Sequence, residues 1–233
     1  MPALDTQTKV AVVGAGAMGS GIAQVAAQAG HQVYLHDQRE GAAEAGRDGI
    51  AKQLQRRVDK GKMQQQELDA VIGRIHPVAN LDDVADAGLV IEAIIEDLQI
   101  KRQLLANLEN LCAGDAILAT NTSSISVTAL GAEMNKPERL VGMHFFNPAP
   151  LMALVEVVMG MATSQAVADT VHATATAWGK KPVYATSTPG FIVNRVARPF
   201  YAESLRLLQE QATDAATLDA IIEASEAVMV ARG

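Results

Sequence analysis

The stretch KVAVVGAGAMGSGIAQVAAQAGHQVYLHD, residues 9–37, decides the fold of this chain. It begins with a short apolar run, Lys9–Val13, which is typical of a strand buried on both faces. A glycine turn follows at once, and Ser20–Ala29 then has the apolar spacing of a helix. A second strand, Gln32–Leu35, leads to Asp37. The order strand, glycine turn, helix, strand and acid predicts a dinucleotide-binding α/β unit.

The glycine turn and the start of the helix supply the expected cofactor loop, which consists of Gly14, Gly16, Ala17, Met18 and Gly19. In such a loop the first glycine permits the tight turn, the second lets the backbone approach a pyrophosphate, and the third lets helix and strand pack closely. The helix N-terminus adds free N–H groups and a partial positive charge.

Asp37 follows the last glycine of the turn by 18 residues, where a carboxylate can accept both hydroxyls of a ribose. The same carboxylate would repel a 2′-phosphate, so we expect NAD rather than NADP as the cofactor. Arg39 is the one residue nearby that argues for NADP.

The composition narrows the class of protein. The chain has 233 residues, of which 49% are apolar, enough for one sizeable core or for one core with a small appendage. A net charge of −7 argues against nucleic acid as a partner, and the single cysteine, Cys112, excludes a disulfide framework or a CxxC metal site. No leader sequence and no apolar run of about 20 residues is present. We therefore expect a cytoplasmic protein with no membrane span and no metal.

Beyond the first unit, Gly41–Lys62 and Gln64–Arg74 read as two helices, antiparallel across a turn near Gly61. Lys52, Arg56 and Lys60 repeat at four-residue spacing on one face of the first helix. Such a basic row is usually a solvated face, but it would also give an anionic substrate a place to dock. Both interpretations stay open at this point.

Further buried strands are expected downstream, at Ile75–Ala79, Gly88–Ile95 and Ala116–Ala119. Gly88–Ile95 ends in Glu96, and Ala116–Ala119 runs into the polar cluster Thr120–Ser124. Ligands of open parallel sheets bind outside the carboxyl ends of the strands, so Glu96, Ser123 and His144 are expected to share one crevice. Alternatively, the polar cluster caps the short helix that follows it, through Ser124 or Ser126.

A second informative stretch is LVGMHFFNPAPLMALVEVV, residues 140–158, which reads as two strands joined by a segment with two prolines. Glu156 lies inside the second apolar run, on the same face as Leu154 and Val158. A carboxylate among apolar neighbours is costly unless it has a partner, and His144 is the candidate partner.

The alternation of strands and helices stops near Thr188-Pro189-Gly190, after which only two helices are expected. We therefore predict an α/β fold with a Rossmann-type, mostly parallel sheet and an inserted helical hairpin over residues 1–188, and a short all-helical portion over residues 189–233. The second part is too short for a substantial core of its own. It must pack on the first part, pair with another chain, or be cut short.

With GAGAMGSGIA, Asp37, NTSS, HFFNP, LVEVV and PGFIVNR in this order, the chain resembles the L-3-hydroxyacyl-CoA dehydrogenase family, 3-hydroxybutyryl-CoA dehydrogenases included. The resemblance implies a reversible NAD-dependent oxidation of L-3-hydroxyacyl-CoA to 3-oxoacyl-CoA, as in the β-oxidation of fatty acids, and a homodimer. Family members usually continue with a GFxMGPFE-like run and more helices, where this sequence ends with EASEAVMVARG. The C-terminal domain and dimer interface are therefore expected to be incomplete.

The resemblance also implies a role for individual residues. His144 is the general acid/base, and Glu156 holds its other ring nitrogen and fixes the tautomer. Ser123 and Asn194 match positions that contact the substrate near its reacting oxygen. Further cofactor contacts are expected from Glu96, Lys101, Ser123 and Asn147. The helix of Gly41–Lys62 matches the one that meets the CoA moiety, with Lys60 as the best-matching lysine and Arg56 or Lys52 assisting.

Two other classes of function remain to be weighed. A dehydrogenase of free β-hydroxyacids would share the glycine loop but would use a catalytic lysine, and no lysine stands in a matching sequence context. A non-catalytic NAD-binding or structural protein would keep the fold without the chemistry. Against this second alternative stands the complete set of His144, Glu156, Ser123 and Asn194.

Overall fold

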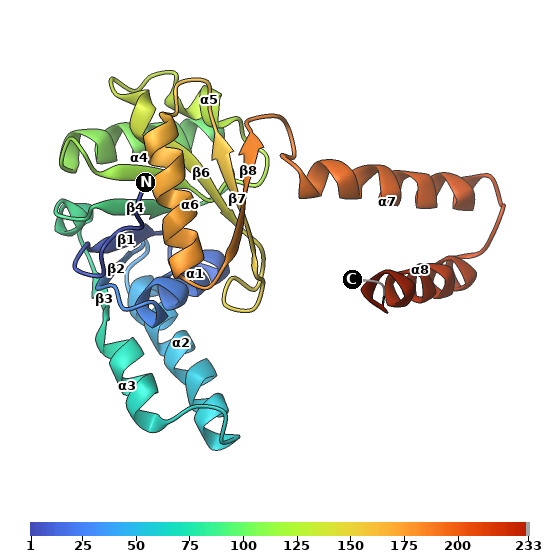
Figure 1. The fold of residues 1–233 in the computed structure, drawn as a ribbon, viewed down its shortest axis with the longest axis horizontal. Coiled ribbons are helices and arrows are strands. Elements are labelled where there is room, and N and C mark those ends of the chain that lie inside the picture. The colour runs from blue at the N-terminus through green and yellow to red at the C-terminus, as the bar shows by residue number, and fades with distance from the viewer. Residues whose placement is uncertain (232–233) are drawn as a thin grey trace. The chain divides into compact units, whose positions relative to one another are not determined.

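The computed structural model describes residues 1–231, and the side chains of residues 1–224. The chain divides into two compact units, Met1–Phe191 and Ile192–Gly233. The first unit is built on an eight-stranded sheet with the order β3-β2-β1-β4-β5-β6-β7-β8 (Figure 1). Its strands are β1 Val10–Val13, β2 Val33–His36, β3 Ile75–Val78, β4 Leu89–Glu92, β5 Ile117–Thr120, β6 Leu140–Phe145, β7 Leu154–Met159 and β8 Lys181–Thr186.

The sheet is mostly parallel, as predicted. Every neighbouring pair is parallel except β6 and β7, which form an antiparallel pair. Apolar residues on both faces explain why β1 and β5 are buried along their whole length. The Rossmann-type fold predicted from residues 9–37 is confirmed.

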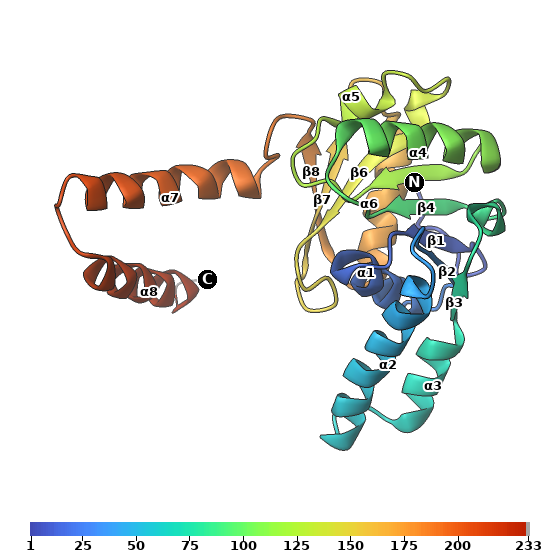
Figure 2. The ribbon, with the colours of Figure 1, turned by 180° about the vertical axis from the view of Figure 1, so that it is seen from behind.

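Helices cover both faces of this sheet (Figures 1 and 2). Side chains of α1 and α6 belong to one apolar core, and those of α4 and α5 belong to the core of the opposite face. The bounds are α1 Ala17–Gln28, α2 Ala42–Asp59, α3 Gln65–Gly73, α4 Leu98–Leu111, α5 Val127–Gly131 and α6 Gln165–Ala177, with two short 3₁₀ turns, η1 Leu81–Val84 and η2 Pro137–Arg139.

The inserted helical hairpin is formed by α2 and α3, which extend away from the sheet between β2 and β3 (Figure 1). A capping box starts α3, in which Gln64 and Glu67 each accept a backbone N–H of the other. Arg47 ties α2 to the end of the hairpin, because its Nε atom donates to the carbonyl oxygen of Ile75 at 3.1 Å. This part of the prediction is also confirmed.

One strand is shorter than predicted. The sequence indicated a strand over Gly88–Ile95 that ends in Glu96, whereas β4 ends at Glu92. The chain turns there because the Glu92 carboxylate accepts the backbone N–H of Ile94 at 2.7 Å. Glu96 therefore lies in the loop between β4 and α4, beside Asp97, whose carboxylate caps α4.

The second unit contains α7 Val193–Gln209 and α8 Ala215–Ala231. Asp214 starts α8, where its carboxylate accepts the N–H and the hydroxyl of Thr217 at 2.9 and 3.0 Å. The helices expected after Pro189 are thus present. Within residues 1–231, no helix is long and apolar enough to cross a membrane.

Candidate active site

The glycine loop is shaped as its sequence predicts. A Cβ atom on Gly14, whose φ is +107°, would lie 2.5 Å from the carbonyl oxygen of Ala93, and one on Gly19 would lie 1.7 Å from that of Gly14. These two glycines are required by packing within the protein. A Cβ atom on Gly16 would meet nothing within 4 Å, and no side chain caps α1, which begins directly after it. The loop therefore leaves space and free N–H groups for a pyrophosphate, and it fits NAD.

Asp37 lines a cleft of about 760 Å³ together with Gly14 and Gly16. Its carboxylate accepts hydrogen bonds from the backbone N–H of Ala15 at 2.8 Å and from the Nε atom of Arg39 at 3.1 Å. Burial acts to raise the pKa of Asp37, but the hydrogen bonds from Arg39 and Ala15 outweigh it and lower this pKa to about 2. The acid is ionised at neutral pH, and the Arg39 side chain is engaged by it.

Replacing Gly16 by valine is expected to remove NADH binding while leaving the fold intact. The new side chain finds open space within the protein, but it occupies the space in front of α1 that a pyrophosphate needs. We expect the dissociation constant for NADH to rise by about tenfold or more, measured by fluorescence titration, with an unchanged melting temperature. Gly19→Ala is the matched control, because its Cβ overlaps Gly14 and should lower the melting temperature. Equal NADH affinity of Gly16→Val and the unaltered protein would contradict this account of the loop.

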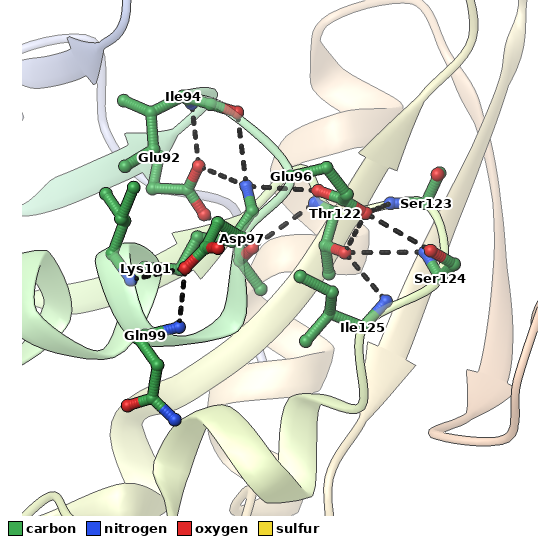
Figure 3. Close-up of polar contacts among 12 residues, drawn as sticks. Glu92, Ile94, Glu96, Asp97, Gln99, Lys101, Thr122, Ser123, Ser124 and Ile125 are labelled. Carbon is green, nitrogen blue, oxygen red and sulfur yellow. Dashed lines mark hydrogen bonds and ion pairs between the residues drawn. The ribbon is translucent and has the colours of Figure 1, made fainter.

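A buried ion pair lies beneath the loop between β4 and α4 (Figure 3). Glu92 is 0% exposed and Lys101 is 1% exposed, and their side chains meet at 2.6 Å. The same Lys101 Nζ atom reaches Glu96 at 3.2 Å and the carbonyl oxygen of Ile94 at 3.3 Å. The other carboxylate oxygen of Glu92 accepts from the Thr120 hydroxyl at 2.8 Å. Lys101, predicted as a cofactor contact, is thus held between two carboxylates.

Glu96 joins this ion pair to the polar cluster after β5 (Figure 3). One oxygen of its carboxylate accepts from the Thr122 hydroxyl at 2.5 Å, the Ser123 backbone N–H at 3.0 Å and the Ser124 hydroxyl at 3.4 Å. Burial acts to raise the pKa of Glu96, but the Thr122 hydrogen bond and the charge of Lys101 outweigh it and hold this pKa below its ordinary value. The predicted crevice residues Glu96 and Ser123 therefore do lie together.

His144 and Glu156 lie opposite each other in the antiparallel pair of β6 and β7. The Nδ1 atom of His144 lies 2.7 Å from a carboxylate oxygen of Glu156, which is 0% exposed. Within the described side chains, the Nε2 atom of His144 has no hydrogen-bond partner. A Glu156 carboxylate at this distance favours the tautomer with a proton on Nδ1, so Nε2 is left as the atom that can exchange a proton with a ligand.

The segment after His144 is fixed at both ends. Asn121, from the polar cluster after β5, accepts the backbone N–H of Phe145 at 2.9 Å. Lys180 is buried and donates to the carbonyl oxygens of Ala149 and Met152 at 2.6 and 2.9 Å. Burial lowers the pKa of Lys180 below its ordinary value. Asn147 is therefore presented on an anchored loop.

Asn147 lines a second cavity, of about 560 Å³, together with Gly16 and Ala17 of the glycine loop and with residues of α2. Among the expected CoA contacts, Lys52, Arg56 and Lys60 are all exposed on the hairpin. Gly46 and Gln53 line the cavity, and Lys60 follows Gln53 by another seven residues, which places it on the same side of the helix. Lys60 of the basic row therefore lies beyond the cavity on the side of the helix that lines it.

Asn194 lies in α7, in the second unit, so its expected place beside the substrate stays a prediction. The NTSS run also has the alternative role considered for it, because the Ser126 hydroxyl caps α5 by accepting the N–H of Ala129 at 3.2 Å. Among the described residues, no group of three or more His, Cys, Asp or Glu side chains could hold a metal ion.

Two buried residues of this region were missed by the sequence reasoning. Glu92 carried a usable signal, since it stands in the apolar run LVIEAII just as Glu156 stands in LVEVV. Lys180 carried none, because a lysine after a helix is usually solvated. Only the fold shows that it anchors the loop beside His144.

The chain is similar to known proteins over nearly all its length. It is 48% identical to the 3-hydroxyadipyl-CoA dehydrogenase of Escherichia coli, with 94% of this chain and 46% of that protein covered. It is 42% identical to a probable 3-hydroxybutyryl-CoA dehydrogenase of Bacillus subtilis, with 92% and 75% covered. A crystal structure of (S)-3-hydroxybutyryl-CoA dehydrogenase from Ralstonia eutropha superimposes with a TM-score of 0.88 at 36% identity, with 91% and 75% covered. The chain thus spans less than half of the first relative and three quarters of the other two.

Two family models match. Residues 9–188 match the NAD binding domain of 3-hydroxyacyl-CoA dehydrogenase, and residues 190–228 match its C-terminal domain. The first match includes the glycine loop, Asp37 and the His144–Glu156 pair. The chain therefore belongs to the 3-hydroxyacyl-CoA dehydrogenase family and carries its NAD-binding domain.

Proposed function

We propose that this protein catalyses the NAD-dependent oxidation of L-3-hydroxyacyl-CoA to 3-oxoacyl-CoA, and the reverse reduction. The observation that carries the proposal is the His144–Glu156 pair, with its 2.7 Å contact and an Nε2 atom left for a ligand. The pair is close in sequence to a residue beside the cofactor loop. Asn147, three residues after His144, lines the same cavity as Gly16 and Ala17. Relatives that bear 3-hydroxyacyl-CoA dehydrogenase names support the same conclusion.

His144 performs the proton transfer. In the oxidation its Nε2 atom accepts the proton of the 3-hydroxyl group, and in the reduction it returns that proton to the developing alkoxide. When bound, NAD supplies the chemistry of hydride acceptance and donation at C3. Glu156 stabilises the imidazolium that forms, since it is a carboxylate at 2.7 Å in a buried setting. Ser123 and Asn194 are proposed to contact the reacting oxygen of the substrate.

The residues proposed to hold NAD come from two sides of the cofactor cleft. Gly14, Gly16, Ala17, Met18 and Gly19 would surround the pyrophosphate, and Asp37 would accept the ribose hydroxyls. Glu96, Ser123 and Asn147 would lie toward the nicotinamide end. Lys101 would act there chiefly through Glu96, because its Nζ atom already lies among Glu92, Glu96 and the carbonyl oxygen of Ile94.

The CoA portion of the substrate is proposed to lie along α2. The second cavity opens between α1, α2 and the loop of Asn147, and the basic residues of α2 continue from it. Lys60 and Arg56 would meet the phosphates of CoA, and Lys52 would contribute less, because it is rotated by about 100° from Gln53 around the helix. A cytoplasmic location, expected from the composition and the N-terminal sequence, and a homodimer, expected from the resemblance, both remain expectations.

A single assay tests the reaction and separates it from the alternatives. We expect the protein to oxidise NADH with acetoacetyl-CoA, followed at the absorbance of NADH, and to leave free acetoacetate unreduced. NADPH should be a poorer donor by about tenfold or more, because the ionised Asp37 repels a 2′-phosphate. Turnover of only the free acid would favour a β-hydroxyacid dehydrogenase, and turnover of neither would favour a non-catalytic protein.

A further inference from the structure

The second cavity is lined by a buried polar side chain with an oxygen atom that accepts no hydrogen bond within the described part of the chain. Gln24 of α1 lines this cavity and is 2% exposed. In the described part of the chain, its Oε1 atom has no hydrogen-bond partner. A buried amide oxygen without a partner costs about 1–3 kcal/mol, so such groups are rare unless something else satisfies them. The position therefore suits a ligand that supplies the missing hydrogen bonds.

The cavity beside Gln24 is lined both by the glycine loop and by α2. One end of the cavity is formed by Gly16, Ala17 and Asn147, which belong to the cofactor side. The other end follows α2, where a Cβ atom on Gly49 would meet nothing within 4 Å. Gln53 lies one turn further, and about 10 Å of helix separates it from Lys60. A molecule that reached from the loop of Asn147 to Lys60 through this cavity would come close to Gln24, which lines it.

We propose that Gln24 recognises an amide group in the pantetheine arm of the acyl-CoA substrate, an inference that rests on the proposed function. In acyl-CoA, secondary amides lie between the thioester and the phosphates, so they would fall in this cavity with the thioester near His144 and the phosphates near Lys60. A glutamine side chain matches such an amide, because its oxygen accepts the N–H and its NH₂ group donates to the carbonyl. Gln24 thereby distinguishes CoA thioesters from free acids and short thioesters.

Replacing Gln24 by methionine tests this role, because methionine keeps the length of the side chain and removes only the amide. Three substrates are compared: acetoacetyl-CoA, acetoacetyl-pantetheine and the ethyl thioester of acetoacetate, which has no amide. We expect kcat/KM to fall by about tenfold for the first two and by less than about twofold for the ethyl thioester. The KM for NADH should not change. The melting temperature should not fall, since a buried unsatisfied amide has been removed.

Gln28→Met, on the exposed end of the same helix, is the control and should leave all three substrates unaffected. Equal losses on all three substrates would overturn the proposal, because they would indicate a purely structural role for Gln24. An unchanged kcat/KM for all three would overturn it as well, while the proposed function would stand. Failure of the unaltered protein to reduce acetoacetyl-CoA would instead overturn the proposed function, and the role of Gln24 with it.

Discussion

Replacing His144 by glutamine is expected to lower kcat for the reduction of acetoacetyl-CoA by about 10²- to 10⁴-fold, the usual loss when a general acid/base is removed. Glutamine cannot exchange a proton near neutral pH. The Nε2 atom of His144 is the atom left open to a ligand, because Nδ1 is engaged by Glu156 at 2.7 Å. The reaction would then depend on proton exchange with water.

The same replacement should leave the fold and the cofactor site intact. Glutamine is uncharged and similar in length to histidine, so the change adds no charge to the buried site beside Glu156. We therefore expect the dissociation constant for NADH to stay within about twofold of its original value. The two measurements, single-turnover kinetics and NADH titration, separate a chemical defect from a structural one.

His172→Gln provides the matched control. This histidine lies on α6, outside the candidate site, and its ring stacks on that of Tyr184 with 4.6 Å between the ring centroids. Its replacement should leave kcat within about twofold. A His144→Gln protein with near-normal kcat would rule out the proposed proton transfer.

The second large effect is expected from Glu92→Leu, which should lower the free energy of unfolding by about 3–5 kcal/mol. The change leaves the ammonium group of Lys101, which is 1% exposed, without its closest carboxylate, at 2.6 Å in the original protein. The remaining carboxylate, on Glu96, lies further away at 3.2 Å. Urea denaturation followed by circular dichroism measures the loss.

Removing both charges separates the effect of the ion pair on the free energy of unfolding from its effect on NADH binding. In Glu92→Leu/Lys101→Met no uncompensated charge remains at this position, so most of the lost stability should return. Glu96 nevertheless loses its cation, and with it the support for its hydrogen bonds to Thr122 and Ser123. We expect weaker NADH binding in the double variant than in the original protein. A double variant as unstable as Glu92→Leu would show that the ion pair is not the cause of the loss.

Local patterns of the sequence predict much of the fold and the centre of the site. The glycine spacing, the apolar strands and the helical hairpin each leave a signal within a short window, and apart from the end of β4 each is found where it was expected. The contact of His144 with Glu156 could also be predicted, because a carboxylate in an apolar strand requires a partner and a histidine precedes it across the turn.

Other features depend on contacts between distant parts of the chain. The end of β4 was misplaced because Ala93–Ile95 is as apolar as the strand itself, and only the Glu92 carboxylate turns the chain at Ile94. Lys101 was expected as a cofactor contact from the resemblance alone, and its burial against Glu92 of β4 has no signal in the local sequence. The unsatisfied amide of Gln24 likewise has no sequence signal, since it depends on where the loop of Asn147 lies.

The two outermost strands, β3 and β8, carry features that disfavour pairing with a strand of another copy. Each contains a proline, Pro77 in β3 and Pro182 in β8. The backbone N–H of Lys181 points inward to Ala153, so the nitrogen of Pro182 faces outward and offers no donor. In β3 the outward carbonyl oxygen of Ile75 is already taken by Arg47. Each edge strand is therefore a poorer template for a further strand, which lowers the risk of edge-to-edge aggregation and favours association through helices and loops.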